Sequence, residues 1–249
     1  MSGHSKWSTI KRKKGAADAK RGKVFSRLAK EVTVAARSGG DPEANARLRT
    51  VLLACRAANM PSDNIDRAIK KGTGELPGVT YEEVRYEAYG PGGVALLIDV
   101  LTDNKNRTVA EIRHMVNRLG GNMAEAGAVT WNFEPRGTIT VAKEGISEED
   151  IFEKAVEAGG DDVDTEGDFY DIATAPNQLH VVAEALESMG ITPSEIKLTM
   201  EPKTTLDVDG KTLTTLLRLL EELEDHDDVQ DVFSNMNATD EAMAAAMGD

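Results

Sequence analysis

Basic residues crowd the start of the sequence, where Asp18 is the one acid among the first thirty positions. The cations are Lys6, Lys11, Arg12, Lys13, Lys14, Lys20, Arg21, Lys23, Arg27 and Lys30. Lysine and arginine neutralise phosphates and release counterions, and the ring of Trp7 in the same stretch can stack on an unpaired base. These residue types therefore predict a nucleic-acid-binding arm.

The charge of the whole chain is divided unevenly along its length. Residues 1–78 hold 17 of the 29 Lys and Arg residues but 7 of the 43 Asp and Glu residues, a net charge of +10. The remainder carries −24, so the chain as a whole carries −14. Surface charge on a globular domain is normally mixed, and this segregation therefore favours a polyanionic partner over a solvated basic helix. Few aromatic residues or leucines precede Val24, which argues against a membrane as that partner.

Other kinds of functional site find little support. Gly15 and Gly22 are too far apart for a phosphate-binding P-loop, and the calcium-loop-like stretch 162–167 has Ala173 where the ligand Glu should be. The four histidines lack metal-ligand spacing, and Cys55 falls on an apolar helix face. We therefore predict no catalytic residue, no metal, no cofactor and no small-molecule substrate.

Composition describes a globular protein, with 40% hydrophobic and 29% charged residues over 249 positions. No apolar run approaches the roughly 18 residues of a membrane helix, and no apolar stretch follows the basic N-terminus as in a secretory signal. A single cysteine excludes an internal disulfide framework and fits a reducing compartment. We expect a cytoplasmic monomer.

Residues 1–78 are predicted to form a small helical domain. The first helix, 16–38, has one apolar and one basic face, made of Val24, Leu28, Val32 and Ala35 and of Lys20, Lys23, Arg27 and Lys30 respectively. The apolar face should pack while the basic face meets solvent or a partner. Asp41 and Pro42 predict the N-cap and first residue of a second helix. A short third helix should begin after Ser62.

The rest of the chain alternates strand and helix patterns, and one of the predicted strands is 129–133. Residues 135–203 show the order strand, helix, strand, strand, helix, strand, which is ferredoxin-like. We interpret this unit as an insertion, so that 79–134 and 204–238 together form a middle domain and 239–249 a flexible acidic tail. The predicted fold class is α+β and multidomain: an N-terminal helical domain plus two α+β domains, the third ferredoxin-like and inserted in the second.

Two loops of the middle domain are candidates for a second contact surface. Asn104, Lys105, Asn106 and Arg107 precede a helix with a capping box predicted at Thr108 and Glu111. Backbone N–H groups there can hold a phosphate that Arg107 grips, or the loop can simply cap its helix. The other loop is Gly90, Pro91, Gly92 and Gly93. It can let a backbone approach RNA or protein closely, although a hairpin turn with positive φ is the favoured interpretation.

Several motifs of this sequence together resemble one family. They are GHSKW at 3–7, DAKRGK at 18–23, YEAYGPGG at 86–93, DNKNRT at 103–108 and GGN at 120–122. In this order they are similar to the YebC family, and the match continues to Val232 and Phe233. The resemblance implies three domains, the third inserted in the second, and no enzymatic activity. It also favours a contact surface at the Asn104–Arg107 loop.

Members of the YebC family are described as DNA-binding transcriptional regulators, and others, including mitochondrial relatives, as translation factors acting on ribosomes, notably at proline-rich stretches. We predict a non-enzymatic regulator that contacts ribosomal RNA through the basic arm. The third helix begins with Asp63, Asn64 and Asp66, whose acids DNA phosphates would repel, so a helix-turn-helix is not expected. The alternatives are a transcriptional regulator that binds duplex DNA and a protein-interaction scaffold that docks the arm on an acidic protein.

Overall fold

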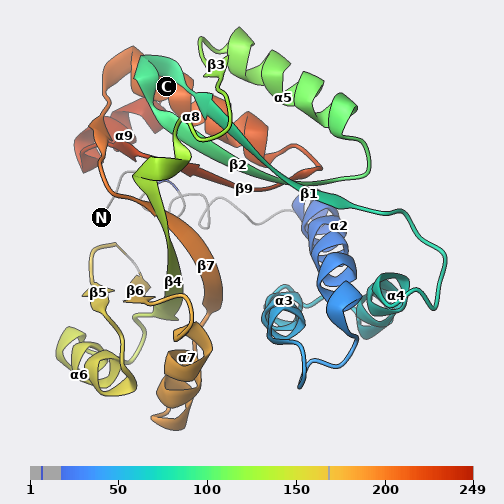
Figure 1. The fold of residues 1–249 in the computed structure, drawn as a ribbon. Helices are drawn as coiled ribbons and strands as arrows, with labels where there is room; N and C mark the ends of the chain where they lie inside the picture. Colours follow the sequence, from blue (N-terminus) through green and yellow to red (C-terminus); the bar gives the residue numbers. More distant parts are fainter. Residues whose placement is uncertain (1–6, 8–17, 168, 249) are drawn as a thin grey trace.

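The computed structural model describes residues 7, 18–167 and 169–248 of the chain. Three helices, α2 to α4, stand beside two four-stranded sheets (Figure 1). The upper sheet of Figure 1 is covered by α5 and α8, and the lower one by α6 and α7. The α+β architecture, with helices first and sheets after, confirms the predicted fold class.

The helical part contains α2 (Asp18–Ala35), α3 (Ala46–Ala57) and α4 (Ser62–Gly72), and a short 3-10 helix, Ala36–Ser38, extends α2. Its core joins buried side chains of all three helices: Leu28, Val32, Ala35, Ala36, Leu48, Val51, Cys55, Met60 and Ala68. Val24 was expected in this core, but its side chain is 43% exposed. The helices α2 and α4 approach so closely that a Cβ on Gly72 would lie 2.3 Å from the carbonyl oxygen of Thr33. Only glycine fits at that crossing.

Helix α3 begins later than predicted. Asn45, rather than Asp41, is the N-cap, and its side chain accepts a hydrogen bond from the N–H of Leu48. The Asn45 amide also donates to the carbonyls of Ala35 and Gly39, both at 2.8 Å, and so ties the new helix to the end of α2. Asp41 instead accepts from the N–H of Glu43 in the preceding turn. Both residues are good caps by type, and the tertiary contact selects Asn45.

The upper sheet is antiparallel, in the order β3-β1-β2-β9. Its strands are β1 (Glu82–Tyr89), β2 (Ala95–Thr102), β3 (Asn122–Met123) and β9 (Val229–Ser234). Helices α5 (Lys105–Arg118) and α8 (Gly210–Glu224) pack on one face, where Ile98, Ile112 and Leu216 are fully buried. Two short parallel strands, β8 (Leu206–Asp207) and β10 (Met236–Asn237), flank this core.

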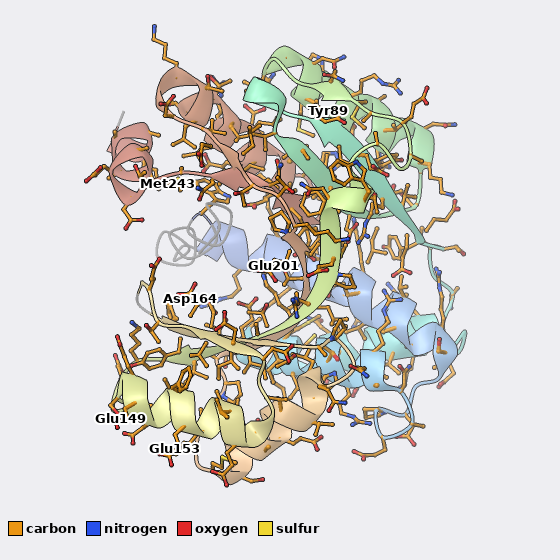
Figure 2. All side chains as sticks on the ribbon, turned by 60° about the vertical axis from the view of Figure 1, so that its left-hand side comes forward. Tyr89, Glu149, Glu153, Asp164, Glu201 and Met243 are labelled. Carbon is orange, nitrogen blue, oxygen red and sulfur yellow. The ribbon has the colours of Figure 1, made fainter. Side chains whose placement is uncertain are left out.

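The lower sheet is also antiparallel, in the order β5-β6-β4-β7. Its elements are β4 (Phe133–Ala142), α6 (Glu148–Ala158), β5 (Asp162–Asp164), β6 (Phe169–Thr174), α7 (Leu179–Ser188) and β7 (Glu195–Pro202). This is the predicted ferredoxin-like arrangement, and it lies in the chain between strands of the upper sheet. Strands β4 and β7 extend toward that sheet, where Phe133 and Met200 pack against Leu97 and Phe233. Figure 2 shows Glu149 and Glu153 on the outer side of α6, pointing away from the lower sheet.

Two further expectations differ from the structure. The predicted strand at 129–133 is a 3-10 turn, Thr130–Asn132, because the buried Glu87 carboxylate accepts hydrogen bonds from the N–H groups of Gly127, Val129 and Thr130 and curls the segment. The tail predicted to be flexible forms α9 (Asp240–Gly248), which packs against α8. Met243 anchors it, with 2% of its surface exposed.

Candidate nucleic-acid interface

Half of the predicted arm lies beyond what the structure describes. Lys6, Lys11, Arg12, Lys13 and Lys14 fall outside the described residues, and only the main chain of Lys20 is described. Their role in binding stays a prediction. The described members of the set are Trp7, Arg21, Lys23, Arg27 and Lys30.

Trp7 is not placed as an exposed stacking platform. Its side chain is 6% exposed and belongs to the core between the upper sheet and α8. The indole Nε1–H lies 3.3 Å from a carboxylate oxygen of Glu224, to which it donates. A large apolar ring with one donor is most stable where it is buried and its N–H is paired. Stacking of Trp7 on a base would therefore require the ring to leave this core.

The basic face of α2 is turned toward the C-terminal end of α8. Lys23 donates to the carbonyl oxygen of Asp225 at 3.1 Å, Arg27 to that of Glu224 at 2.6 Å, and Lys30 to that of Asp227 at 2.9 Å. A helix C-terminus has unpaired carbonyl groups and the negative end of the helix dipole, so cations are favoured there. The separate basic face predicted from sequence exists, but in this structure it meets an acidic segment of the same chain.

Asp228 is the centre of this contact and is almost fully buried, with 5% of its surface exposed. Its carboxylate accepts hydrogen bonds from Lys30 Nζ at 2.7 Å, Arg107 Nη2 at 2.7 Å, Thr108 Oγ1 at 2.8 Å and Thr102 Oγ1 at 3.2 Å. Burial alone would raise the pKa of Asp228, but the hydrogen bonds from Lys30, Arg107 and Thr108 outweigh it and hold the pKa well below its usual value. The acidic run at 221–228 therefore contains one deeply buried charge.

The Asn104–Arg107 loop makes the contacts of a helix cap. The side chain of Asn104 accepts from the N–H of Arg107, so α5 starts at Lys105 and the predicted capping box at Thr108 is wrong. Thr108 points inward to Asp228 because that carboxylate is its buried partner. Lys105 pairs with Glu82 at 2.5 Å, and Arg107 pairs with Asp103 as well as Asp228. Asn106 is exposed.

The glycine-rich loop lies elsewhere. Gly90, Pro91, Gly92 and Gly93 join β1 to β2, with φ of 75° at Gly92 and 81° at Gly93, which is the geometry of the favoured turn interpretation. Thr212 of α8 lies so near Gly92 that an added Cβ there would be 2.9 Å from its methyl group. This turn and Asn104 are at opposite ends of β2, so the two candidate loops do not form one surface. The fold instead brings Arg107 beside Lys30.

Between the helical part and the upper sheet is a hollow of about 960 Å³ with mixed charge. Its charged and titratable side chains are those of Lys23, Lys30, Arg107, His114, His226, Tyr81, Asp103, Glu111, Asp225, Asp227 and Asp228. In the part of the chain that the structure describes, no cluster of three or more His, Cys, Asp or Glu residues has the arrangement of a metal site. None of the described helices combines the length and apolar character that a membrane span requires.

Comparison with known proteins assigns the family. The model of the TACO1/YebC N-terminal domain matches residues 5–75, and that of the TACO1/YebC second and third domains matches residues 81–236. A probable transcriptional regulatory protein of Desulfotalea psychrophila is 56% identical over 98% of both chains. Another protein of that name, from Geobacter sulfurreducens, is 53% identical over 99% of this chain and 100% of its own length.

A solved structure is similar over nearly the whole fold. It is the crystal structure of a conserved hypothetical protein from Aquifex aeolicus, with a TM-score of 0.84 and 44% sequence identity. The match covers 90% of this chain and 93% of that one. Together with the domain matches and the relatives, it confirms the resemblance inferred from the sequence motifs: the chain belongs to the TACO1/YebC family.

Proposed function

We propose that this protein is a non-enzymatic, nucleic-acid-binding regulator of gene expression that acts in the cytoplasm, on the ribosome, and contacts RNA through the basic N-terminal arm. The observation that carries the proposal is the separation of charge, +10 in residues 1–78 against −24 in the remainder. A polyanion is attracted to the first part and repelled by the second, so it is held in one orientation. The relatives' names support a regulatory role.

Different parts of the positive charge have different roles in this proposal. Lys23, Arg27 and Lys30 already donate to residues 224–228, so RNA would compete with the protein's own acidic segment for them. The primary contacts are therefore assigned to Lys6 and the run Lys11, Arg12, Lys13 and Lys14. Arg67 and Lys71 add to them, because the side chains of these two α4 cations form no hydrogen bond or ion pair with any described residue.

RNA is favoured over duplex DNA by the shape and charge of α4. A recognition helix reaches base edges with its N-terminal residues, but α4 has Asp63 in its first turn and Lys70 and Lys71 in its last. An arm with a high density of lysine, by contrast, can follow the phosphates between RNA helices.

Sedimentation with ribosomal particles at physiological salt tests the proposal. The wild-type chain should travel in part with ribosomes. A variant with Lys11, Arg12, Lys13 and Lys14 replaced by glutamine should remain at the top of the gradient. This variant is preferable to deletion of the arm, because deletion would also remove Trp7 from the core. If roughly four to eight phosphates are contacted, log K should fall with log[salt] at a slope of about −3 to −7, and the variant should flatten it by about 3.

The matched control neutralises four exposed cations outside residues 1–78: Arg113, Lys203, Lys211 and Arg218. Its net charge equals that of the arm variant, but it should sediment like the wild type. Equal loss of ribosome binding in both variants would show a dependence on net charge alone and refute the arm as the contact.

A transcriptional regulator that binds duplex DNA is the second candidate, favoured by the names of the relatives. Under it, the wild-type chain stays at the top of the gradient and binds a defined promoter duplex well above random DNA of the same length.

A further inference from the structure

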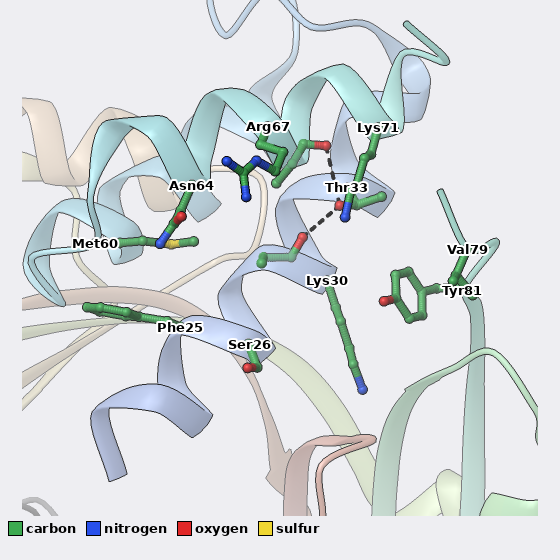
Figure 3. A pocket seen from close by; sticks show the side chains of 12 residues that line it. Phe25, Ser26, Lys30, Thr33, Met60, Asn64, Arg67, Lys71, Val79 and Tyr81 are labelled. Atoms are coloured by element: carbon green, nitrogen blue, oxygen red, sulfur yellow. Dashed lines mark hydrogen bonds between the residues drawn. The ribbon is translucent and has the colours of Figure 1, made fainter. Parts of the chain in front are cut away.

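A second hollow, of about 450 Å³, lies within the helical part, between α2 and α4. Figure 3 shows Phe25 at one end and Tyr81 at the other, with Arg67 between them on the side of α4. The wall of the hollow also includes Val79, in the segment that leads from α4 to β1. The volume is in the range of sites that hold small ligands or single chemical groups of larger ones.

The charge of this hollow has one sign. Lys30, Arg67 and Lys71 line it, and none of the described acidic side chains does. Lys30 is neutralised by Asp228, but the side chains of Arg67 and Lys71 form no hydrogen bond or ion pair with any described residue. They stand four residues apart on one side of α4, where like charges destabilise a helix slightly. An anion in the hollow would relieve that repulsion.

The floor and ends of the hollow are apolar and aromatic. Ala29, Thr33, Met60 and Ala68 form the floor, and the Thr33 hydroxyl is already paired with the carbonyls of Ala29 and Ala68. Phe25 and Tyr81 are half-buried, so their rings are held by the fold while part of each remains accessible. The Lys30 ammonium lies 5.6 Å from the centroid of the Tyr81 ring. Asn64, one turn before Arg67, adds an amide with both a donor and an acceptor.

We propose that this hollow binds one unpaired nucleotide of an RNA strand. The flat base packs against the aromatic rings and the apolar floor, Asn64 hydrogen-bonds its edge, and Arg67 and Lys71 hold the phosphate. Unpaired bases on aromatic side chains beside cations are the usual mode of single-strand recognition. The proposal rests on the proposed function, to which it adds a defined site distinct from the arm.

Fluorescence anisotropy with a short labelled oligouridine tests the site in the full-length protein. Arg67→Gln combined with Lys71→Gln should weaken binding by about tenfold, and Tyr81→Leu by a similar factor, since it removes the ring but keeps an apolar side chain. The control combines Arg56→Gln with Lys70→Gln, two exposed cations that do not line the hollow. This control has the same net charge as the Arg67 and Lys71 double variant, and its affinity for the oligouridine should fall by less than about threefold. Arg67 and Lys71 have no described partner, so unfolding temperatures should be unchanged in both double variants.

Photocrosslinking with 4-thiouridine in the same oligomer locates the base. A crosslink to Phe25 or Tyr81 supports the proposal, and crosslinks confined to other parts of the chain overturn it. Equal loss of affinity in the test and control variants also overturns it. Full competition by polyglutamate overturns it as well, because the hollow would then accept any polyanion rather than a nucleotide. RNA binding that depends on the arm but not on Arg67 and Lys71 overturns this site alone. Absence of RNA binding by the wild type overturns the proposed function with it.

Discussion

Replacing Asp228 by asparagine preserves the shape of the side chain and removes its negative charge. That charge is held by Lys30, Arg107, Thr108 and Thr102, and it joins the helical part to the upper sheet. Breaking a buried ion pair costs about 3–5 kcal/mol. Asparagine still accepts one or two of the hydrogen bonds, and the ion pair with the exposed Arg107 contributes little to stability. We therefore expect the free energy of unfolding to fall by about 2–4 kcal/mol.

The measurement is the free energy of unfolding by urea near neutral pH. Asp227→Asn is the matched control, because Asp227 is exposed and only its main-chain carbonyl takes part in the contact with Lys30. The control should lose less than about 0.5 kcal/mol. If the two variants are equally stable, Asp228 is not the link between α2 and the upper sheet.

The effect of Asp228→Asn should also depend on pH. The hydrogen bonds lower the pKa of Asp228, so its charge stabilises the fold fully above the ordinary carboxyl range near 4. That stability is lost as the pH falls through the lowered pKa. The difference in the free energy of unfolding between wild type and variant should therefore be constant from about pH 8 to pH 5 and shrink in stronger acid. A difference that persists unchanged at low pH would attribute it to packing rather than to charge.

Three further predictions concern other parts of the fold. Burial raises the pKa of Glu31 to about 7, so its charge costs stability as the pH rises from about 4.5 to 7. Glu31→Gln should therefore raise the unfolding temperature at pH 8.5 and leave it unchanged at pH 4. An equal shift at both pH values would exclude ionisation of Glu31 as the cause. Gly72→Ala should lower the free energy of unfolding by urea by about 1–3 kcal/mol, because the added methyl group meets the backbone of α2. The control Gly22→Ala, whose methyl group meets nothing within 4 Å, should be neutral or stabilising. Removing 240–248 exposes the core beneath Met243 and should lower the unfolding temperature by several degrees; an unchanged temperature would mean that α9 adds no stability.

Much of the fold was predictable from local pattern. The spacing of Leu28, Val32 and Ala35 predicted the packed face of α2, and all three are buried. The alternation of strands and helices in 135–203 predicted the ferredoxin-like sheet, since hydrophobic period and turn residues are local properties. The start of α5 was not predictable in this way, because Asn104 and Thr108 are both acceptable cap types. Thr108 is excluded as the cap by Asp228, a residue from a distant part of the chain.

The candidate site shows the same division between sequence and structure. The sequence by itself determined that positive charge is concentrated in residues 1–78 and that α2 has a basic face, because charge and helical period are written in the order of residues. Only the tertiary structure decided what that face meets: the end of α8 brings its carbonyl groups and Asp228 within hydrogen-bonding distance of Lys23, Arg27 and Lys30. It also decided that Trp7 is buried rather than exposed, and that Arg67 and Lys71 share a hollow with Phe25 and Tyr81. Such pairings depend on the relative placement of elements far apart in the chain, which no local pattern specifies.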